Sequence, residues 1–346
     1  MGARETHTLR AACCAAGTLA FLLLVFTLVA CGGSGAPATG SPEATASAAV
    51  ATPSPSSTVP SWQDLQGQNA GANSTLVVDI PAADAAFPRL KKMFAYDRSE
   101  PLAFNEVGAA GWGGDRNRMI EYASAGCTVT GSLAVPKGEG PFPVVVMAAP
   151  GSMAFIYKTQ VPALVRSGLA VLAVDAPNVR DPYLDLDGIE ADPERYIKAS
   201  ARWVVDMRRA LDLAESLPKL DGERIGYVGF SGTGMIGALL AGVDPRVKAY
   251  VLDYAGGSNK GLEGLTGEVQ DPADYLAHNR GASFLFQYTK EDTDDGVFAP
   301  ARVEKLVDAA PEPKTFQWVK GGHGALFESA DTPGSRFYRA WLKENL

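Results

Sequence analysis

The chain has 346 residues, 46% of them hydrophobic and 20% charged, so it carries enough apolar side chain to bury a core. Its 31 Lys and Arg residues against 39 Asp and Glu residues give a net charge of -8, the wrong sign for a surface that neutralises nucleic-acid phosphates. Four cysteines and three histidines are too few for a cysteine-rich metal module or a site of several histidines. We therefore expect neither a nucleic-acid partner nor a bound metal.

The first thirty residues have the composition of an export signal. Arg4 and Arg10 precede an uncharged run, residues 11–30, with a leucine-rich centre. This run is close to the roughly 20 residues that cross a bilayer, so an uncleaved transmembrane anchor is one interpretation. The run ends in the sequence LVAC, which resembles the lipobox of bacterial lipoproteins. The resemblance implies an extracytoplasmic protein whose mature chain begins at a lipidated Cys31 and is anchored to the membrane.

The segment after Cys31 differs sharply in composition from the rest of the chain. Residues 31–61 are mostly Gly, Ser, Ala, Thr and Pro, and Glu43 is their only charge. Such a segment has too little apolar side chain to offset the entropy of ordering it, so it predicts a disordered tether. Residues 62–346 remain for one folded domain, with a core from about residue 101.

The globular part opens with a predicted antiparallel hairpin. Residues 119–123 and 127–135 are strand-like and are separated by the turn Ser-Ala-Gly. The two following runs, at residues 142–149 and 169–175, are continuously apolar. Runs of this kind are typical of strands buried on both faces of a parallel sheet.

The remaining elements alternate between helix and strand. Helices are predicted over residues 158–166, 193–217, 235–241, 302–309 and 335–345, and strands over 224–230, 247–254, 282–288 and 315–319. Alternation after an opening hairpin predicts an α/β protein with one doubly wound, mostly parallel sheet and an antiparallel N-terminal edge. Residues 177–192 and 257–281 lack clear periodicity and are expected to be loops.

The turn between the strand at 224–230 and the next helix fits two motifs. Its sequence, GFSGTG, places Ser231 between an apolar strand and an apolar helix, as in a nucleophile elbow, whose strained turn lifts the serine hydroxyl out of the sheet. The overlapping sequence GTGMIG fits the dinucleotide fingerprint G-x-G-x-x-G. Asp253 ends the following strand, near the position of a ribose-binding acid.

A nucleophilic serine needs a histidine base and a carboxylate that orients it. Only His278 and His323 follow Ser231, and His323 lies just past the last strand in the sequence KGGHG. The acidic loop TKEDTDD follows the strand at 282–288. Candidates therefore occur in the order serine, acid, histidine, whereas we expect no chemical role for His278.

From about residue 101 onward the chain resembles α/β-hydrolases of the dienelactone-hydrolase and acetyl-esterase type. The resemblance is carried by the sequences PFP, VVVMAAPGS, GFSGTG, FLFQYTKED and GGHG. It implies the α/β-hydrolase fold with little or no cap, and it places the catalytic acid a few residues past the penultimate strand. That position favours Asp292, with Asp294 as the alternative and Asp253 third. We interpret Asp253 and Asp175, both at strand ends, as structural caps of the loops that follow.

Two positions depart from the family pattern. Thr233 replaces the second glycine of G-x-S-x-G with a bulkier, β-branched residue, and Pro150-Gly151 stands where His-Gly is usual. The backbone N–H groups of Gly232 and Ser152 are nevertheless expected to form the oxyanion hole, because backbone donors do not depend on side-chain identity. A serine nucleophile also favours ester hydrolysis over dienelactone chemistry.

The expected activity is hydrolysis of small or medium acyl esters through an acyl-enzyme, without a cofactor. The first alternative is a catalytically degenerate hydrolase fold that only binds ligands, which the departures at Thr233 and Pro150 favour. The second is an NAD-binding oxidoreductase. The order of elements counts against it, because two buried parallel strands precede the glycine-rich turn and too few βα units follow Asp253.

Overall fold

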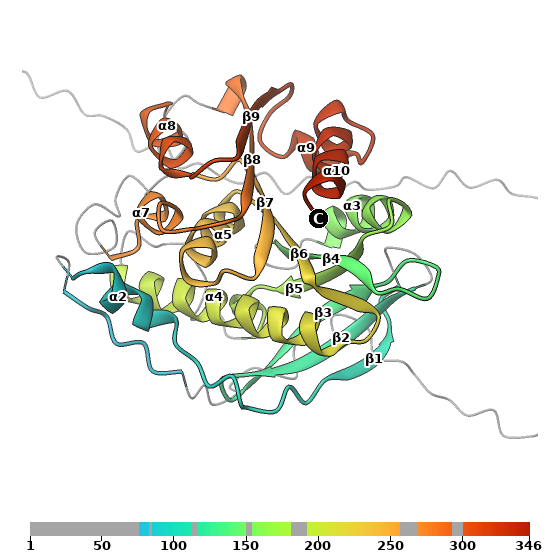
Figure 1. Cartoon of the computed structure of the whole chain (residues 1–346), viewed down its shortest axis with the longest axis horizontal. Coiled ribbons are helices and arrows are strands. Elements are labelled where there is room, and N and C mark those ends of the chain that lie inside the picture. The colour runs from blue at the N-terminus through green and yellow to red at the C-terminus, as the bar shows by residue number, and fades with distance from the viewer. Residues whose placement is uncertain are drawn as a thin grey trace, which may run out of the picture. The chain divides into compact units, whose positions relative to one another are not determined.

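The computed structural model describes residues 76–82, 85–111, 116–149, 154–180, 192–256, 269–292 and 300–346. The described residues form a mixed sheet of nine strands with helices on both faces (Figure 1). The predicted export signal, the lipidated Cys31 and the tether lie outside these residues and stay predictions. Within the described ranges, no helix combines the length and hydropathy needed to cross a membrane.

The strands lie in the order β1-β2-β3-β5-β4-β6-β7-β8-β9. Three of them form an antiparallel edge: β1 (Asn105–Ala109), β2 (Asn117–Ser124) and β3 (Cys127–Ala134). The other six run parallel: β4 (Phe142–Ala149), β5 (Ala170–Asp175), β6 (Leu220–Phe230), β7 (Val247–Asp253), β8 (Ser283–Thr289) and β9 (Lys314–Val319). The predicted mostly parallel sheet with an antiparallel N-terminal edge is confirmed.

Helices cover each face of the sheet with a separate hydrophobic core (Figure 1). One face carries α2 (Phe87–Leu90), η1 (Lys91–Phe94), α4 (Pro193–Ser216), α5 (Gly232–Val243), α7 (Pro272–Leu276) and α8 (Pro300–Ala309). The other carries α3 (Ala154–Arg166), α9 (Ala325–Glu328) and α10 (Pro333–Asn345). Because both faces are covered, β4 is apolar throughout and β5 is apolar as far as Asp175, instead of alternating.

The long helix α4 is capped and anchored by its own acidic residues. The Asp192 carboxylate accepts a hydrogen bond of 3.0 Å from the Arg195 N–H at the start of the helix. Farther along, buried Asp206 pairs with Arg202 at 3.1 Å and accepts a 2.6 Å hydrogen bond from Ser124 Oγ. These contacts hold α4 against the end of β2.

Several short elements were not predicted, among them strand β1 and helices α2, α7 and α9. Strand β1 has the sequence NEVGA and is mostly exposed, so it lacks the apolar pattern of a buried strand. Helix α7 lies within residues 257–281, which were expected to be a loop. It has only five residues, too few to show a helical period, and is capped by Asp271, which accepts a 2.9 Å hydrogen bond from the Ala273 N–H. The His278 ring just beyond α7 stacks on Phe87, with ring centroids 3.6 Å apart.

Candidate active site

Ser231 lies in the turn that connects β6 to α5. Its φ of 54° and ψ of -121° are strained for a residue with a Cβ. The Ser231 N–H donates to the carbonyl of Asp253 at 2.9 Å, and the Ser231 carbonyl accepts from the Met235 N–H at 3.2 Å. The neighbouring strand and the first turn of α5 thus hold the strained residue from both sides. Ser231 itself is partly exposed, in the strand-turn-helix context that the sequence predicted.

Two glycines allow the turn to be this tight. A Cβ on Gly229 would lie 2.4 Å from the carbonyl oxygen of Thr233, and a Cβ on Gly234 would lie 2.7 Å from the Cβ of Ala255. Neither distance is tolerable for carbon, so both positions require glycine. Gly232, in contrast, has open space where its Cβ would stand. Gly232 begins α5, so its N–H is one of the first-turn donors that lack a partner within the helix.

Thr233, which replaces the second glycine of G-x-S-x-G, fits the turn and is hydrogen-bonded within it. Its side chain is completely buried, and its Oγ1 accepts a 2.7 Å hydrogen bond from the Phe230 N–H. The same hydroxyl lies 2.9 Å from the Ala148 carbonyl and 2.8 Å from the Phe230 carbonyl. It can donate its single proton to either of these two carbonyls. The threonine therefore links the end of β4 to the end of β6 beside Ser231.

His323 follows β9 and is exposed at the edge of the sheet where Ser231 lies. Its ring packs against two aromatic residues at the ends of β6 and β7. The ring centroids are 4.8 Å from Phe230, the residue before Ser231, and 5.2 Å from Tyr254. The Tyr254 hydroxyl donates to the carbonyl of Gly322 at 3.4 Å. The structure thus brings the candidate base beside the strand ends that flank the candidate nucleophile.

The loop with the candidate acid leaves the sheet next to the loop of His323. Thr289 at the end of β8 is paired with Val319 at the end of β9. Asp292 ends the short helix η5 (Lys290–Asp292) three residues past Thr289, and His323 lies four residues past Val319. The segments that lead to Asp292 and to His323 therefore start from adjacent strand ends. The alternative acid, Asp294, lies outside the described residues, as does Ser152, the second expected oxyanion donor.

Asp253 and Asp175 are not the loop caps that their positions suggested. Asp253 is completely buried, and neither of its carboxyl oxygens has a hydrogen-bond partner among the described residues. Burial raises the pKa of Asp253 well above its usual range. Asp175 accepts a 2.5 Å hydrogen bond from Thr130 Oγ1, and burial raises its pKa to about 7. Both side chains point into the protein instead of closing a turn.

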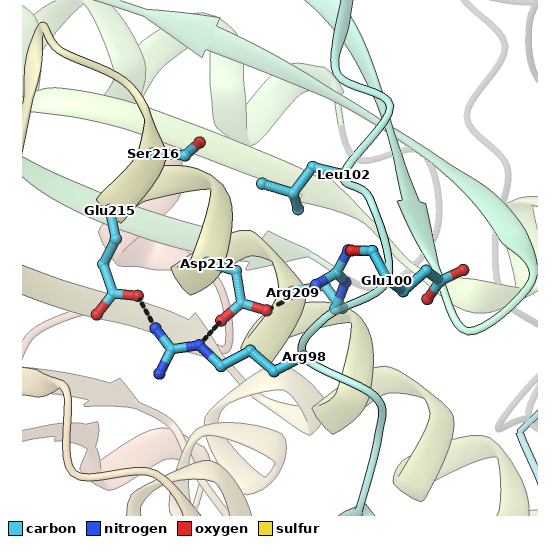
Figure 2. Close-up of a pocket in the computed structure, with 7 residues that line it drawn as sticks. All are labelled: Arg98, Glu100, Leu102, Arg209, Asp212, Glu215 and Ser216. Atoms are coloured by element: carbon cyan, nitrogen blue, oxygen red, sulfur yellow. Dashed lines mark hydrogen bonds and ion pairs between the residues drawn. The ribbon is translucent and has the colours of Figure 1, made fainter.

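A cavity of about 320 Å³ is lined by residues of α4 and of the segment that precedes β1 (Figure 2). The cavity lies near the C-terminal end of α4, which leads into the start of β6. Ser231 follows the other end of β6, so the cavity and Ser231 lie at opposite ends of this strand. Arg98 pairs with Asp212 at 3.3 Å and with Glu215, and Arg209 pairs with Asp212 at 2.9 Å. Ser216 Oγ, the one hydroxyl among the described residues that line the cavity, donates to the backbone carbonyl of Leu213. The cavity is therefore lined by a structural ion-pair network.

Phe230 and Tyr254 were not predicted as parts of the site. Their contacts with His323 depend on which residues end neighbouring strands, and their positions at the ends of β6 and β7 were the available signal. No described group of three or more His, Cys, Asp and Glu residues is arranged to hold a metal ion.

Neither a family model nor a curated protein matches the sequence, so the comparison rests on solved structures. The acetyl xylan esterase 1 of Thermoanaerobacterium sp. JW/SL YS485 superposes with a TM-score of 0.57 at 15% identity, covering 78% of this chain and 96% of that one. The acetyl xylan esterase of Paenibacillus sp. R4 gives 0.56 at 17% identity, covering 82% and 98%. A dienelactone-hydrolase-like protein of Klebsiella pneumoniae gives 0.52 at 21%, covering 64% and 95%.

These similarities, together with the strand order, decide the fold. The chain has the α/β-hydrolase fold. In this fold, Ser231, the first residues of the acidic loop and His323 follow the carboxyl ends of β6, β8 and β9, in the chain order serine, acid, histidine.

Proposed function

We propose that this α/β-hydrolase is a serine esterase that acts through a covalent acyl-enzyme. The observation that carries the proposal is the strained backbone of Ser231 at the start of α5, with His323 packed against Phe230 next to it. A strained turn of this kind exposes a serine hydroxyl above the sheet, where a substrate carbonyl can reach it. The α/β-hydrolase fold alone would not assign this activity, because one fold hosts many chemistries.

In the proposed mechanism, Ser231 Oγ attacks the ester carbonyl while His323 takes the serine proton. Asp292 orients the imidazole and stabilises its protonated form. The N–H groups of Gly232 and Ser152 donate to the oxyanion, and His323 returns the proton to the departing alcohol. Water, deprotonated by His323, then attacks the acyl-enzyme and releases the carboxylic acid and free Ser231. No step requires a cofactor.

Two observations disfavour the dinucleotide alternative. In a dinucleotide-binding turn, the second glycine lets the pyrophosphate approach the backbone. Here the space beside the corresponding Gly234 is filled by Ala255, 2.7 Å from where a Cβ would stand. Asp253, the candidate ribose-binding acid, is completely buried and cannot contact a ligand in solvent. Gly234 and Gly237, the second and third glycines of GTGMIG, therefore serve packing within the protein.

The proposed substrates are esters of small or medium acyl groups. Two of the structures that share this fold are acetyl xylan esterases, which favours short acyl chains such as acetyl. We also propose that Cys31 is lipidated, because it follows an apolar export segment and precedes a long polar tether. The protein would then act outside the cytoplasm, held near a membrane.

A panel of acyl esters of graded length tests the proposal on the chain from residue 62 onward. We expect turnover of acetate and butyrate esters, and a loss of about 10⁶-fold in kcat for Ser231→Ala, as in other enzymes whose nucleophile is removed. Ser132→Ala is the matched control, because Ser132 is buried in β3, away from the turn. No turnover by the wild-type protein would favour the ligand-binding alternative.

A further inference from the structure

Three buried acceptor oxygens are left without a donor beneath the candidate site. They belong to Asp253 and Gln287, which are directly paired across β7 and β8 and are both completely buried. Paired residues of neighbouring parallel strands point to the same face of the sheet, with their Cβ atoms about 5 Å apart. Among the described residues, Asp253 Oδ1, Asp253 Oδ2 and Gln287 Oε1 have no hydrogen-bond partner.

The orientation of the Gln287 amide is fixed by its other contacts. Its Nε2 donates to Gln317 Oε1 at 2.6 Å and to the backbone carbonyl of Gly334 at 3.3 Å. A backbone carbonyl can only accept, so the nitrogen must face Gly334, and both of its protons are used. Gln287 Oε1 therefore needs a donor from another group.

An ionised Asp253 cannot be that donor, because a carboxylate only accepts hydrogen bonds. Its burial also disfavours the charged form, since desolvation dominates there. The titratable groups that interact electrostatically with Asp253 are two uncharged phenols, Tyr288 of β8 and Tyr338 of α10. On the other side, β6 places the apolar Phe230 at the position paired with Asp253. Both phenols donate elsewhere, to the Ala255 carbonyl and to Gln160.

We propose that Asp253 is a neutral carboxylic acid that donates a hydrogen bond to Gln287 Oε1 and thereby positions His323. The connection to His323 runs through the backbone and through Tyr254. The carbonyl of Asp253 accepts from the Ser231 N–H at 2.9 Å, and the N–H of Tyr254 donates to the Gln287 carbonyl at 2.9 Å. Tyr254 has a φ of 50°, packs against His323 and donates to Gly322. Fixing the end of β7 thus fixes both the elbow and the ring on which His323 rests.

Infrared difference spectroscopy tests the protonation of Asp253 directly. At pH 7 the wild-type protein should show a C=O stretching band from protonated, buried Asp253 beside the band of Asp175, whose pKa is about 7, and Asp253→Asn should lack the Asp253 band and keep that of Asp175. Asp175→Asn is the matched control, because Asp175 is also a buried carboxyl at a strand end. The Asp253 band should persist in that variant. If Asp253→Asn removes no such band from the wild-type spectrum, Asp253 is ionised and the proposal is wrong.

Kinetics test the positioning role, which rests on the proposed esterase function. Asparagine retains a donor toward Gln287, so Asp253→Asn should keep kcat near that of the wild type. Leucine has a similar size and no donor, so Asp253→Leu should lose about 10²-fold in kcat with little change in KM, as expected for a misplaced catalytic group. A loss of about 10⁴-fold in Asp253→Asn would instead identify Asp253 as the acid of the triad.

Equal kcat values for Asp253→Asn and Asp253→Leu would also overturn the positioning role. The infrared result does not depend on turnover. An inactive wild-type protein whose spectrum shows the Asp253 band would therefore contradict the esterase function and leave the protonation of Asp253 established.

Discussion

The N–H of Phe230 donates a 2.7 Å hydrogen bond to the side-chain oxygen of Thr233, across the turn that contains Ser231. The bond spans three residues and closes the turn from its buried side. The same hydroxyl lies 2.9 Å from the Ala148 carbonyl at the end of β4. Thr233 therefore couples the strand that leads into the proposed oxyanion loop to the strand that ends at the proposed nucleophile.

This coupling predicts that Thr233→Val destabilises the protein and that Thr233→Ser does so far less. Valine has nearly the same shape but no hydroxyl, so Thr233→Val leaves the buried Phe230 N–H without its acceptor. We expect a loss of about 2 kcal/mol in the free energy of unfolding, together with reduced esterase activity. Thr233→Ser keeps the hydroxyl and should retain most of both. Urea denaturation at constant m-value measures the difference, and equal stability of the two variants would show that the hydroxyl is unimportant.

Much of the fold follows from patterns that one sequence can show. The continuously apolar runs of β4 and β5 predict strands buried on both faces, and the long stripe of α4 predicts its helix almost to the residue. Strand β1 and helix α7 were missed for a common reason. A short edge strand and a five-residue helix bury too little surface to impose a pattern on their sequences.

The candidate site was predictable only in part. Ser231 stands out because its turn lies between an apolar strand and an apolar helix, and His323 because only two histidines follow that turn. The accommodation of Thr233 was not predictable, because its hydroxyl bonds to Ala148, which lies 85 residues away in sequence. The proposed protonation of Asp253 likewise depends on Gln287, which is identified as its neighbour only by the pairing of β7 with β8.

The acid of the proposed triad is distinguished by asparagine substitutions in the acidic loop. We expect Asp292→Asn to lower kcat by about 10⁴-fold, because an amide cannot stabilise the protonated imidazole or hold its productive tautomer. Asp294→Asn should have a small effect. Glu291→Gln is the control, since the exposed Glu291 carboxylate accepts a hydrogen bond from Thr289 instead. Small and similar losses in both aspartate variants would refute the assignment of the acid to this loop.

Buried Asp175 predicts that part of the protein's stability is lost as the pH rises. Its pKa is raised from 3.8 to about 7 in the folded state, so between these values the folded protein binds a proton that the unfolded chain releases. The contribution is fully present below about pH 4 and declines as the pH rises toward 7. Asp175→Asn, which can still accept from Thr130, should therefore flatten the dependence. Thermal denaturation from pH 4 to pH 8 provides the comparison; parallel curves for the two proteins would contradict the shift.

The proposed lipid anchor predicts a change of location for one substitution. In a bacterial host that processes lipoproteins, the wild-type chain should fractionate with membranes and incorporate labelled fatty acid. Cys31→Ala should incorporate none and be released from the membrane fraction or accumulate unprocessed. Cys127→Ala, which removes the buried cysteine of β3, should behave like the wild type. Retention of processed Cys31→Ala in membranes would favour the transmembrane-anchor interpretation.

Covalent labelling of Ser231 tests the central claim most directly. A fluorophosphonate probe reacts with a serine only when a base activates it and an oxyanion hole receives the phosphoryl oxygen. We expect the wild-type protein to be labelled on the peptide that contains Ser231, the Ser132→Ala control to be labelled equally, and Ser231→Ala to remain unlabelled. A folded wild-type protein that takes up no probe, or that takes it up equally after Ser231→Ala, would contradict the assignment of Ser231 as the nucleophile.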